Sequence, residues 1–355
     1  TGRPPSLRSF GRTGDLSTLE ESTDQGVRVR RYHPRLPYHI LEDAHQPLWK
    51  RFVWHKLDLL PFGREREMTR RIIEDVKPDL ILTHNLRGMR ICVVGAIQSS
   101  RVRWMHTLHD IQLLVPSGQY WFDRAPLWQW RIITKPFQWW TRWLMGSPNV
   151  VVGPTKYIIN EHRRAGLFAQ STTRVIRNPV EDIPTIARAF NGAHDPLRLA
   201  CVGQLTVHKG VHVLLEALQE VNGRARVDVF GDGPEMTVLM NRASRLPETI
   251  DVRFRGKVPH DELLKELTEC DALVFPSIIV ENCPGAVLEA VVVGLPVIGS
   301  EVGGVPELID LSGLVPPANP RALANKINAL RRGEVRCFAE ATPNMTINEY
   351  IRRLL

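Results

Sequence analysis

Glu281–Glu289, with the sequence ENCPGAVLE, joins a loop to a helix start and places a glutamate at each end. The residues before it, VFPS from Val274 to Ser277, are typical of a buried strand that runs into a loop. Ala286 to Val293 is apolar enough for a buried helix, and Pro284 suits its first position because proline has no N–H to leave unpaired. Short apolar strands alternate with amphipathic helices along the chain, which predicts an α/β fold with parallel sheets covered on both faces.

The start of this helix is a candidate anion site. Its free N–H groups and positive dipole end favour a negative group, and a diphosphate is the obvious one. Glu289 lies about one turn further on, where a carboxylate can accept hydrogen bonds from vicinal hydroxyls. Because its neighbours are apolar and buried carboxylates are rare unless partnered, we favour a functional role over a surface charge. A hydrolase pair with Glu281 is disfavoured, because eight helical residues separate carboxylates by up to ~12 Å, against about 5–9.5 Å in glycosidases.

A second constellation lies at Leu199–Gly210, where a predicted strand leads through Gly203 to Lys209 and then to a helical pattern from Val211 to Val221. A glycine after a strand lets the backbone approach a ligand closely. A lysine before a helix N-terminus adds a mobile positive charge. Taken alone, this spacing could equally mark a tight strand-to-helix turn.

Together these motifs resemble family 4 of the retaining GT-B glycosyltransferases. The resemblance rests on VGQL at 202–205 with Lys209-Gly210, FGDGP at 230–234, FRGKV at 254–258, FPS at 275–277, the stretch 281–289 and GGVPE at 303–307. The first half matches more loosely, through KPDL at 77–80 with His84-Asn85, TLHD at 107–110, PTKY at 154–157 and RNPV at 177–180. The fold that it implies is two Rossmann-like domains facing each other across a cleft.

The resemblance also implies residue roles. Lys209 would contact the donor diphosphate, Glu289 the ribose hydroxyls and Glu281 the transferred sugar, while His109 would reach the sugar or acceptor near the reacting carbon. His109, Lys209 and Glu281 are therefore the expected catalytic residues. The remaining expected donor contacts are Gly203, Gln204, Val258 beside the nucleobase, and the loop residues Asn282, Cys283, Pro284 and Gly285.

The chain departs from the family pattern in two places. Gln204 stands where many members have an arginine, so it supplies hydrogen bonds without charge. Residues 1–24 are polar, and the first convincing strand is Gly26–Tyr32, which resembles a later strand of the family's first domain. We therefore expect the family's first strand, its glycine-rich loop and its first helix to be missing from this chain.

Length and composition agree with two domains. The 355 residues can form an N-terminal acceptor-side domain at 1–180, a nucleotide-sugar domain at 181–335 and a closing helix within 336–355 that returns toward the first domain. No apolar run reaches the ~18–20 residues of a membrane-spanning helix. The five scattered cysteines favour a reducing cytoplasm. We expect a cytoplasmic protein, peripheral on the inner face of the plasma membrane if it binds lipid.

Positive charge gathers in the first half of the chain. Residues 1–180 carry 28 Lys and Arg against 15 Asp and Glu, whereas residues 181–355 carry 18 against 23. The stretch Trp121–Trp143 interleaves basic residues with six of the nine tryptophans: Trp121, Trp128, Trp130, Trp139, Trp140 and Trp143. Such a helix can lie on an anionic membrane surface. It can equally pack its tryptophans into the core and extend its arginines outward. Nucleic acid is disfavoured as a partner, because no nucleic-acid motif accompanies the patch.

Histidines follow two predicted strands, at the sheet edge where ligands collect in open parallel sheets. A site role is favoured for His109, whereas a structural role is favoured for His84 and a packed position for His106. No metal-ligand spacing occurs, so we predict neither a metal nor a cofactor beyond a UDP-, GDP- or ADP-sugar donor. The expected reaction is metal-independent hexosyl transfer, with retention of configuration, to a polysaccharide or glycolipid acceptor in cell-envelope biosynthesis. The alternatives are a sugar-nucleotide-binding protein without transferase activity and a basic adaptor for membrane or nucleic acid.

Overall fold

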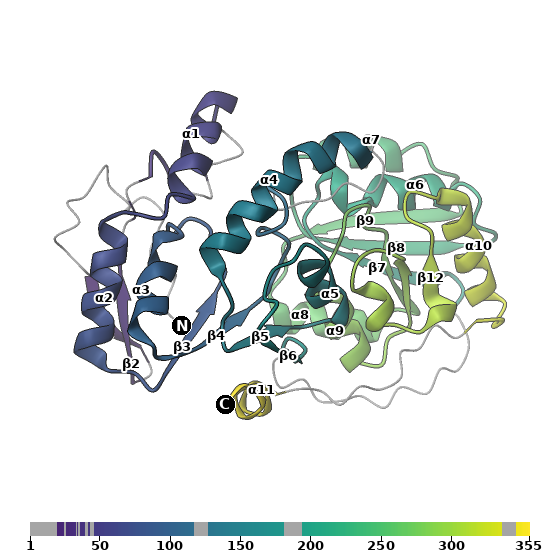
Figure 1. The fold of residues 1–355 in the computed structure, drawn as a ribbon. Helices are drawn as coiled ribbons and strands as arrows, with labels where there is room; N and C mark the ends of the chain where they lie inside the picture. Colours follow the sequence, from purple (N-terminus) through teal and green to yellow (C-terminus); the bar gives the residue numbers. More distant parts are fainter. Residues whose placement is uncertain are drawn as a thin grey trace. The chain divides into compact units, whose positions relative to one another are not determined.

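A computed structural model of the chain describes residues 20–24, 26–32, 34, 36–39, 42, 46–116, 127–180, 194–335 and 346–355, with the backbone alone at residues 48 and 127–133. The first elements (Figure 1) are β1 (Glu20–Asp24), β2 (Val27–Arg31), α1 (Leu48–Asp58), α2 (Arg64–Val76), β3 (Leu80–His84), α3 (Cys92–Ser100), β4 (Arg103–Thr107), α4 (Leu127–Met145), β5 (Val150–Gly153), α5 (Lys156–Arg164) and β6 (Thr172–Val175). The later ones are β7 (Leu197–Val202), η3 (Val207–Lys209), α6 (Val211–Leu218), β8 (Ala225–Phe230), α7 (Met236–Ala243), β9 (Ile250–Gly256), α8 (His260–Thr268), β10 (Ala272–Phe275), α9 (Gly285–Val292), β11 (Val297–Ser300), η4 (Val305–Glu307), η5 (Leu311–Gly313), β12 (Leu314–Val315), α10 (Pro320–Arg331) and α11 (Ile347–Leu354). The predicted α/β class is confirmed.

The chain divides into two compact units, residues 1–105 with 143–146, and residues 106–142 with 147–355. The predicted domain boundaries at residues 180 and 335 stay predictions. A four-stranded sheet has the order β3-β4-β5-β6, with β5 and β6 parallel. In the second unit, a six-stranded sheet has the order β12-β11-β10-β7-β8-β9, and each pair of neighbours is parallel. Numbered from β7, this is the doubly wound order 3-2-1-4-5-6.

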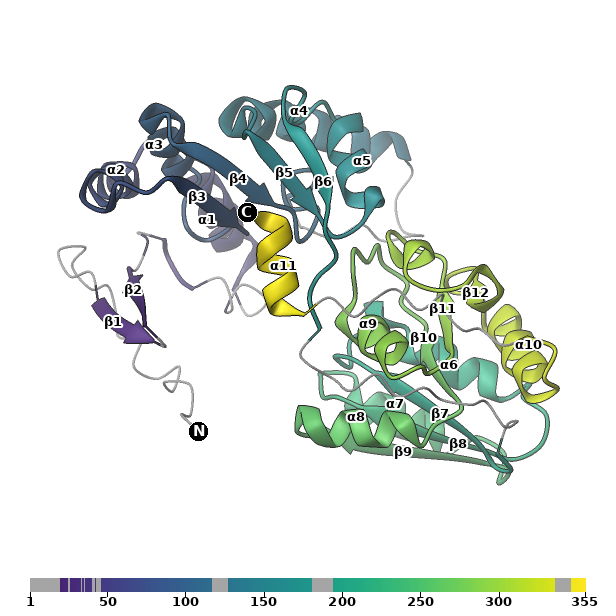
Figure 2. The ribbon, with the colours of Figure 1, turned by 90° about the horizontal axis from the view of Figure 1, so that it is seen from below.

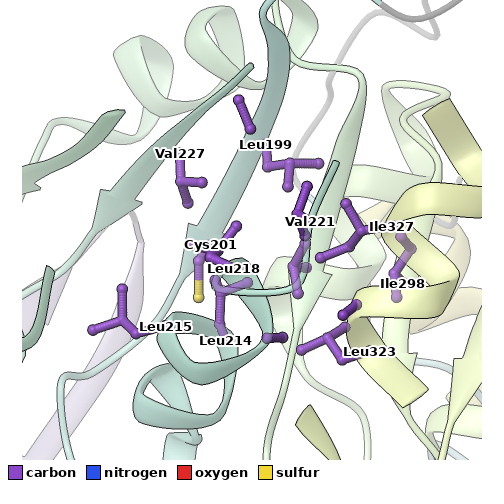
Figure 3. Close-up of a cluster of buried hydrophobic side chains, with 14 of the residues drawn as sticks. Leu199, Cys201, Leu214, Leu215, Leu218, Val221, Val227, Ile298, Leu323 and Ile327 are labelled. Atoms are coloured by element: carbon purple, nitrogen blue, oxygen red, sulfur yellow. The ribbon is translucent and has the colours of Figure 1, made fainter. Parts of the chain in front are cut away.

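Both faces of the six-stranded sheet are buried. Because side chains alternate along a strand, Leu199 and Cys201 of β7 point to one face and Ala200 to the other. Figure 3 shows the first face, where α6 contributes three leucines and α10 contributes Leu323 and Ile327. Helices α8 and α9 cover the second face (Figure 2). Burial on both sides explains why the strands are near-continuous apolar runs.

The first unit begins with a hairpin that the sequence predicts only in part. The predicted strand at Gly26–Tyr32 forms β2, which pairs antiparallel with β1 so that Glu20 faces Arg31. Among the described residues, this hairpin is a sheet of its own and does not extend the four-stranded sheet. Every residue of β1 is exposed, so its sequence carries no alternation by which a strand could be recognised.

The C-terminal residues form the helix that the sequence predicts. Thr346 caps α11 by accepting a hydrogen bond from the Glu349 N–H. The helix contacts β6 through Arg174, which donates to the Arg353 carbonyl at 3.4 Å, and it buries Leu354. Residues 336–345 lie outside the described residues. Across the parts of the chain that the structure describes, no helix combines the length and apolar character needed to cross a bilayer.

His162 on α5 predicts a pH-dependent stability. Its ring is completely buried and burial lowers its pKa to about 4, against 6.5 when unfolded. A base with a lowered folded pKa destabilises the native state as pH falls below the unfolded value, so stability is full above pH 6.5 and declines toward pH 4. We expect about 2 kcal/mol less unfolding free energy at pH 5 than at pH 7 from this group. Urea unfolding should show a shallower pH slope for His162→Gln, and an unchanged slope would contradict the assignment.

Candidate functional site

The functional residues of the second unit gather where the strand order reverses. Strands β7 and β10 are neighbours, and the chain moves outward from them in opposite directions. In open α/β sheets, ligands bind outside the carboxyl ends of the strands at this switch point. Lys209 follows β7 and Glu281 follows β10, so the topology brings two motifs that are 72 residues apart to one edge.

Lys209 and Glu281 form an ion pair, with 2.6 Å between Nζ and Oε1. Their side chains are 25% and 13% exposed, so water screens the pair only in part. Ser277, which is fully buried, donates a hydrogen bond to the same Glu281 oxygen at 2.9 Å. The structure therefore unites two of the three expected catalytic residues and adds a serine to which the sequence assigns no role.

Two glycines allow this close approach. Gly210 ends the turn that carries Lys209 with φ +70°, and a Cβ there would lie 1.9 Å from the Pro276 carbonyl oxygen. Gly303 has φ +56°, and a Cβ there would lie 2.0 Å from the Glu281 carbonyl oxygen. Both contacts are with backbone atoms, so neither position tolerates a side chain without movement of the loop that holds Glu281.

Asn282 ties the loop to residues much earlier in the chain. Its side-chain amide donates to the His109 carbonyl at 3.0 Å and its side-chain oxygen accepts from the Thr155 hydroxyl at 2.7 Å. The backbone of His109 thus lies beside the Glu281 loop, and the expected contact of its side chain with the sugar or acceptor stays a prediction. Its side chain is exposed, and partial burial lowers its pKa.

Glu307 is a further contact that the sequence did not reveal. Its carboxylate accepts from the N–H groups of Lys156 and Tyr157 at 2.7 and 2.6 Å, which caps the start of α5. Arg177 donates to the Glu307 carbonyl at 2.7 Å. The GGVPE motif contains Glu307, but its partner helix lies 150 residues away, so no local pattern could assign the cap.

The predicted buried helix is α9, with Pro284 at its N-cap, one residue before the expected position. Pro284 supplies no side-chain cap for the first N–H groups of α9, in contrast to the start of α5, where the Glu307 carboxylate accepts from two N–H groups. Glu289 is 20% exposed, and its Oε1 lies 3.2 Å from Nε2 of His260. His260 is a second neighbour that the sequence did not predict.

The remaining expected donor residues differ in position. Gly203 directly follows β7 with φ +155°, and a Cβ there would meet no atom within 4 Å. Gln204 is exposed, and among the described residues its side chain takes no part in the Lys209–Glu281–Ser277 network. Val258 and Cys283 pack against the same buried cluster as α9, and burial raises the pKa of the Cys283 thiol to about 11.

Within the described ranges, no three His, Cys, Asp or Glu residues gather as a metal site would require. That the reaction needs no metal stays a prediction.

The chain matches two family models that follow each other along the sequence. Residues 17–182 match "Glycosyltransferase Family 4", and residues 196–332 match "Glycosyl transferases group 1". The two motif-bearing halves of the sequence thus correspond to two described families of one enzyme class.

Curated relatives are similar over parts of their length. An amylovoran biosynthesis glycosyltransferase of Erwinia amylovora is 35% identical over 153 residues, which are 40% of this chain and 37% of the relative. A putative teichuronic acid biosynthesis glycosyltransferase of Bacillus subtilis is 29% identical over 274 residues, which are 74% of this chain and 63% of the relative. The chain therefore spans between about a third and two thirds of these relatives.

Solved structures share the fold. The Anabaena protein HepE in complex with UDP superposes with a TM-score of 0.59 at 19% identity, over 82% of this chain and 78% of HepE. Sucrose-phosphate synthase from Thermosynechococcus elongatus gives a TM-score of 0.61 at 19% identity, over 89% of this chain and 77% of that enzyme. The architecture is that of the GT-B glycosyltransferases, which consist of two Rossmann-like domains.

Proposed function

Because this chain belongs to family 4 of the GT-B glycosyltransferases, we propose that it transfers a sugar from a nucleoside-diphosphate donor to a polysaccharide or glycolipid acceptor of the cell envelope. Relatives named for amylovoran and teichuronic acid biosynthesis support this class of acceptor. Retention of anomeric configuration is part of the proposal, through an oxocarbenium-like transition state.

The observation that carries the proposal is the Lys209–Glu281 pair at the strand switch point. Negative charge builds on the diphosphate as it leaves, and a cation already held in place stabilises that charge without reorganisation. The Lys209 ammonium has three N–H donors, so it can keep its bond to Glu281 and still donate to a phosphate oxygen. Glu281 fixes the cation, and its remaining acceptor sites suit the hydroxyls of the transferred sugar.

The start of α9 and Glu289 would hold the nucleotide. The uncapped N–H groups of this helix suit the diphosphate, and the partly exposed Glu289 carboxylate suits a ribose diol. HepE, which shares the fold, has been solved with UDP and with UDP-glucose. A UDP-sugar is therefore the first donor to test for binding.

Donor binding can be measured as thermal stabilisation by UDP-, GDP- and ADP-sugars. A ligand at a hundred times its Kd adds about 2.7 kcal/mol to the folded state. We expect one nucleotide class to raise the Tm of the native chain and to lose this effect in Glu289→Ala. The matched control is Glu220→Ala, which removes an exposed carboxylate two residues after α6. Equal stabilisation of Glu289→Ala and the native chain would refute the ribose assignment.

The second candidate is a protein of the same fold that binds sugar nucleotides without transfer. It is favoured by Gln204, which leaves the loop after β7 without the arginine expected there. Release of free nucleoside diphosphate from a bound donor separates the candidates. A donor that stabilises the chain but is never cleaved, with any envelope polysaccharide or glycolipid fraction present, would favour the second.

A further inference from the structure

Helix α4 presents aromatic and basic side chains to solvent along one stripe. The α4 stripe consists of Lys135, Trp139, Arg142 and Trp143, all exposed and spaced as neighbours on one side of a helix. The two tryptophans are 65% and 58% exposed. Large aromatic side chains at this exposure, adjacent along a helix, are typical of an interaction surface.

Polar side chains on the other side of α4 explain why the tryptophans point outward. Thr134, Gln138 and Thr141 are buried. Gln138 donates to the Leu114 carbonyl at 3.2 Å, and Thr141 donates to the Leu113 carbonyl at 2.7 Å. These bonds give two loop carbonyls their hydrogen-bond donors and fix the rotation of α4 about its axis. The α4 stripe on the opposite side of the helix therefore remains exposed to solvent. Of the two alternatives that the sequence leaves open, packing into the core does not hold for Trp139 and Trp143, whereas Trp121, Trp128 and Trp130 lie outside the described side chains.

The charge of α4 selects the partner. Its sequence from Leu127 to Met145 contains three basic residues and no acidic one. Tryptophan prefers the boundary between headgroups and acyl chains, and Lys or Arg near an anionic bilayer adds a favourable term for each charge. We propose that the α4 stripe is a docking surface for a bilayer of anionic phospholipids. The surface would hold the protein where lipid-linked molecules lie, and it does not depend on the proposed transfer reaction.

Co-sedimentation with vesicles tests this surface. The native chain is expected to bind phosphatidylcholine vesicles that contain phosphatidylglycerol better than phosphatidylcholine alone, and to bind more weakly at high salt. Trp139→Ser with Trp143→Ser should lower binding at least about tenfold. Lys135→Gln with Arg142→Gln should lower it about fivefold per charge and abolish the preference for phosphatidylglycerol.

The control pair is Val238→Ser with Met240→Ser, which removes two exposed apolar side chains from α7 and should leave vesicle binding unchanged. Each variant should keep the native Tm and donor stabilisation, so a failure of the donor site is recognised separately. The proposal is overturned if the native chain ignores vesicles, or if the tryptophan variant binds like the native chain. Loss of binding on changing Trp49 and Phe52 alone would move the surface to α1, which also exposes aromatic residues. Tryptophan-dependent binding of an oligonucleotide, or self-association, without vesicle binding would assign the stripe to a different partner.

Discussion

Replacing Lys209 by alanine is expected to lower kcat by about 10²–10³-fold and to weaken donor binding much less. The reason is that the leaving diphosphate carries more charge in the transition state than in the bound donor, so the ammonium contributes most at that point. Steady-state release of nucleoside diphosphate gives kcat, and donor titration followed by protein Tm gives the binding term. Lys265→Ala, which removes an exposed lysine from α8, is the matched control and should match the native chain.

The ion pair complicates this variant in a way that can be measured. Without Lys209, the Glu281 carboxylate stays 2.9 Å from the Ser277 hydroxyl with its charge uncompensated at an 87% covered position, and it would repel the diphosphate. Glu281→Gln in the Lys209→Ala background removes that repulsion. We expect the double variant to recover donor affinity while kcat remains low. Equal losses in kcat and in affinity for Lys209→Ala, with no recovery in the double variant, would show that the lysine binds the donor without favouring its transition state.

Local motifs predict much of this site because its parts are short loops after buried strands. Gly203, Lys209 and α6 follow β7 as expected, and Glu281 and α9 follow β10. The sheet order then joins the two segments, because the doubly wound order 3-2-1-4-5-6 places the first and fourth strands side by side. The motifs therefore assign both residues to one donor site, and the strand order of the structure makes them neighbours although 72 residues separate the two.

The contacts that local patterns miss are those whose partners are distant and unmarked. Asn282 meets Thr155 across 127 positions, and Glu307 meets α5 across about 150. Asparagine and glutamate are also ordinary surface residues, so only the folded backbone shows which N–H or hydroxyl they face.

Helix α4 shows a different limit. The spacing of its tryptophans fits a buried face and an exposed face equally well, because both repeat every three or four residues. Composition does not decide between the two, because tryptophans and basic residues suit a membrane surface as well as a packed face. The structure shows the orientation in which Trp139 and Trp143 are exposed, because Gln138 and Thr141 donate hydrogen bonds to loop carbonyls. The orientation of α4 is decided by hydrogen bonds to a neighbouring loop, and the spacing of residues within the helix carries no information about these bonds.

Gly210→Ala is expected to cost at least about 2 kcal/mol more than an ordinary substitution at a left-handed glycine. Gly333 provides the matched control, since it has φ +72° against +70° for Gly210, and a Cβ at Gly333 meets no atom within 4 Å. Gly333→Ala therefore reports only the backbone strain, about 1 kcal/mol. Gly210→Ala adds the overlap with the Pro276 carbonyl oxygen. Because this oxygen belongs to the backbone, no side-chain rotation can relieve the overlap.

The consequence for the site separates this prediction from a general loss of stability. Pro276 precedes Ser277, and the His208 carbonyl accepts from the Ile278 N–H at 2.9 Å, so movement at Pro276 shifts the strand end that holds Glu281. We expect Gly210→Ala to lose donor stabilisation even at temperatures where circular dichroism shows it folded, and Gly333→Ala to keep it. Equal Tm values for the two variants would mean that the loop after β10 can move away from the added methyl group at little cost in stability. The close fit between Gly210 and Pro276 could then not be what holds Lys209 against Glu281.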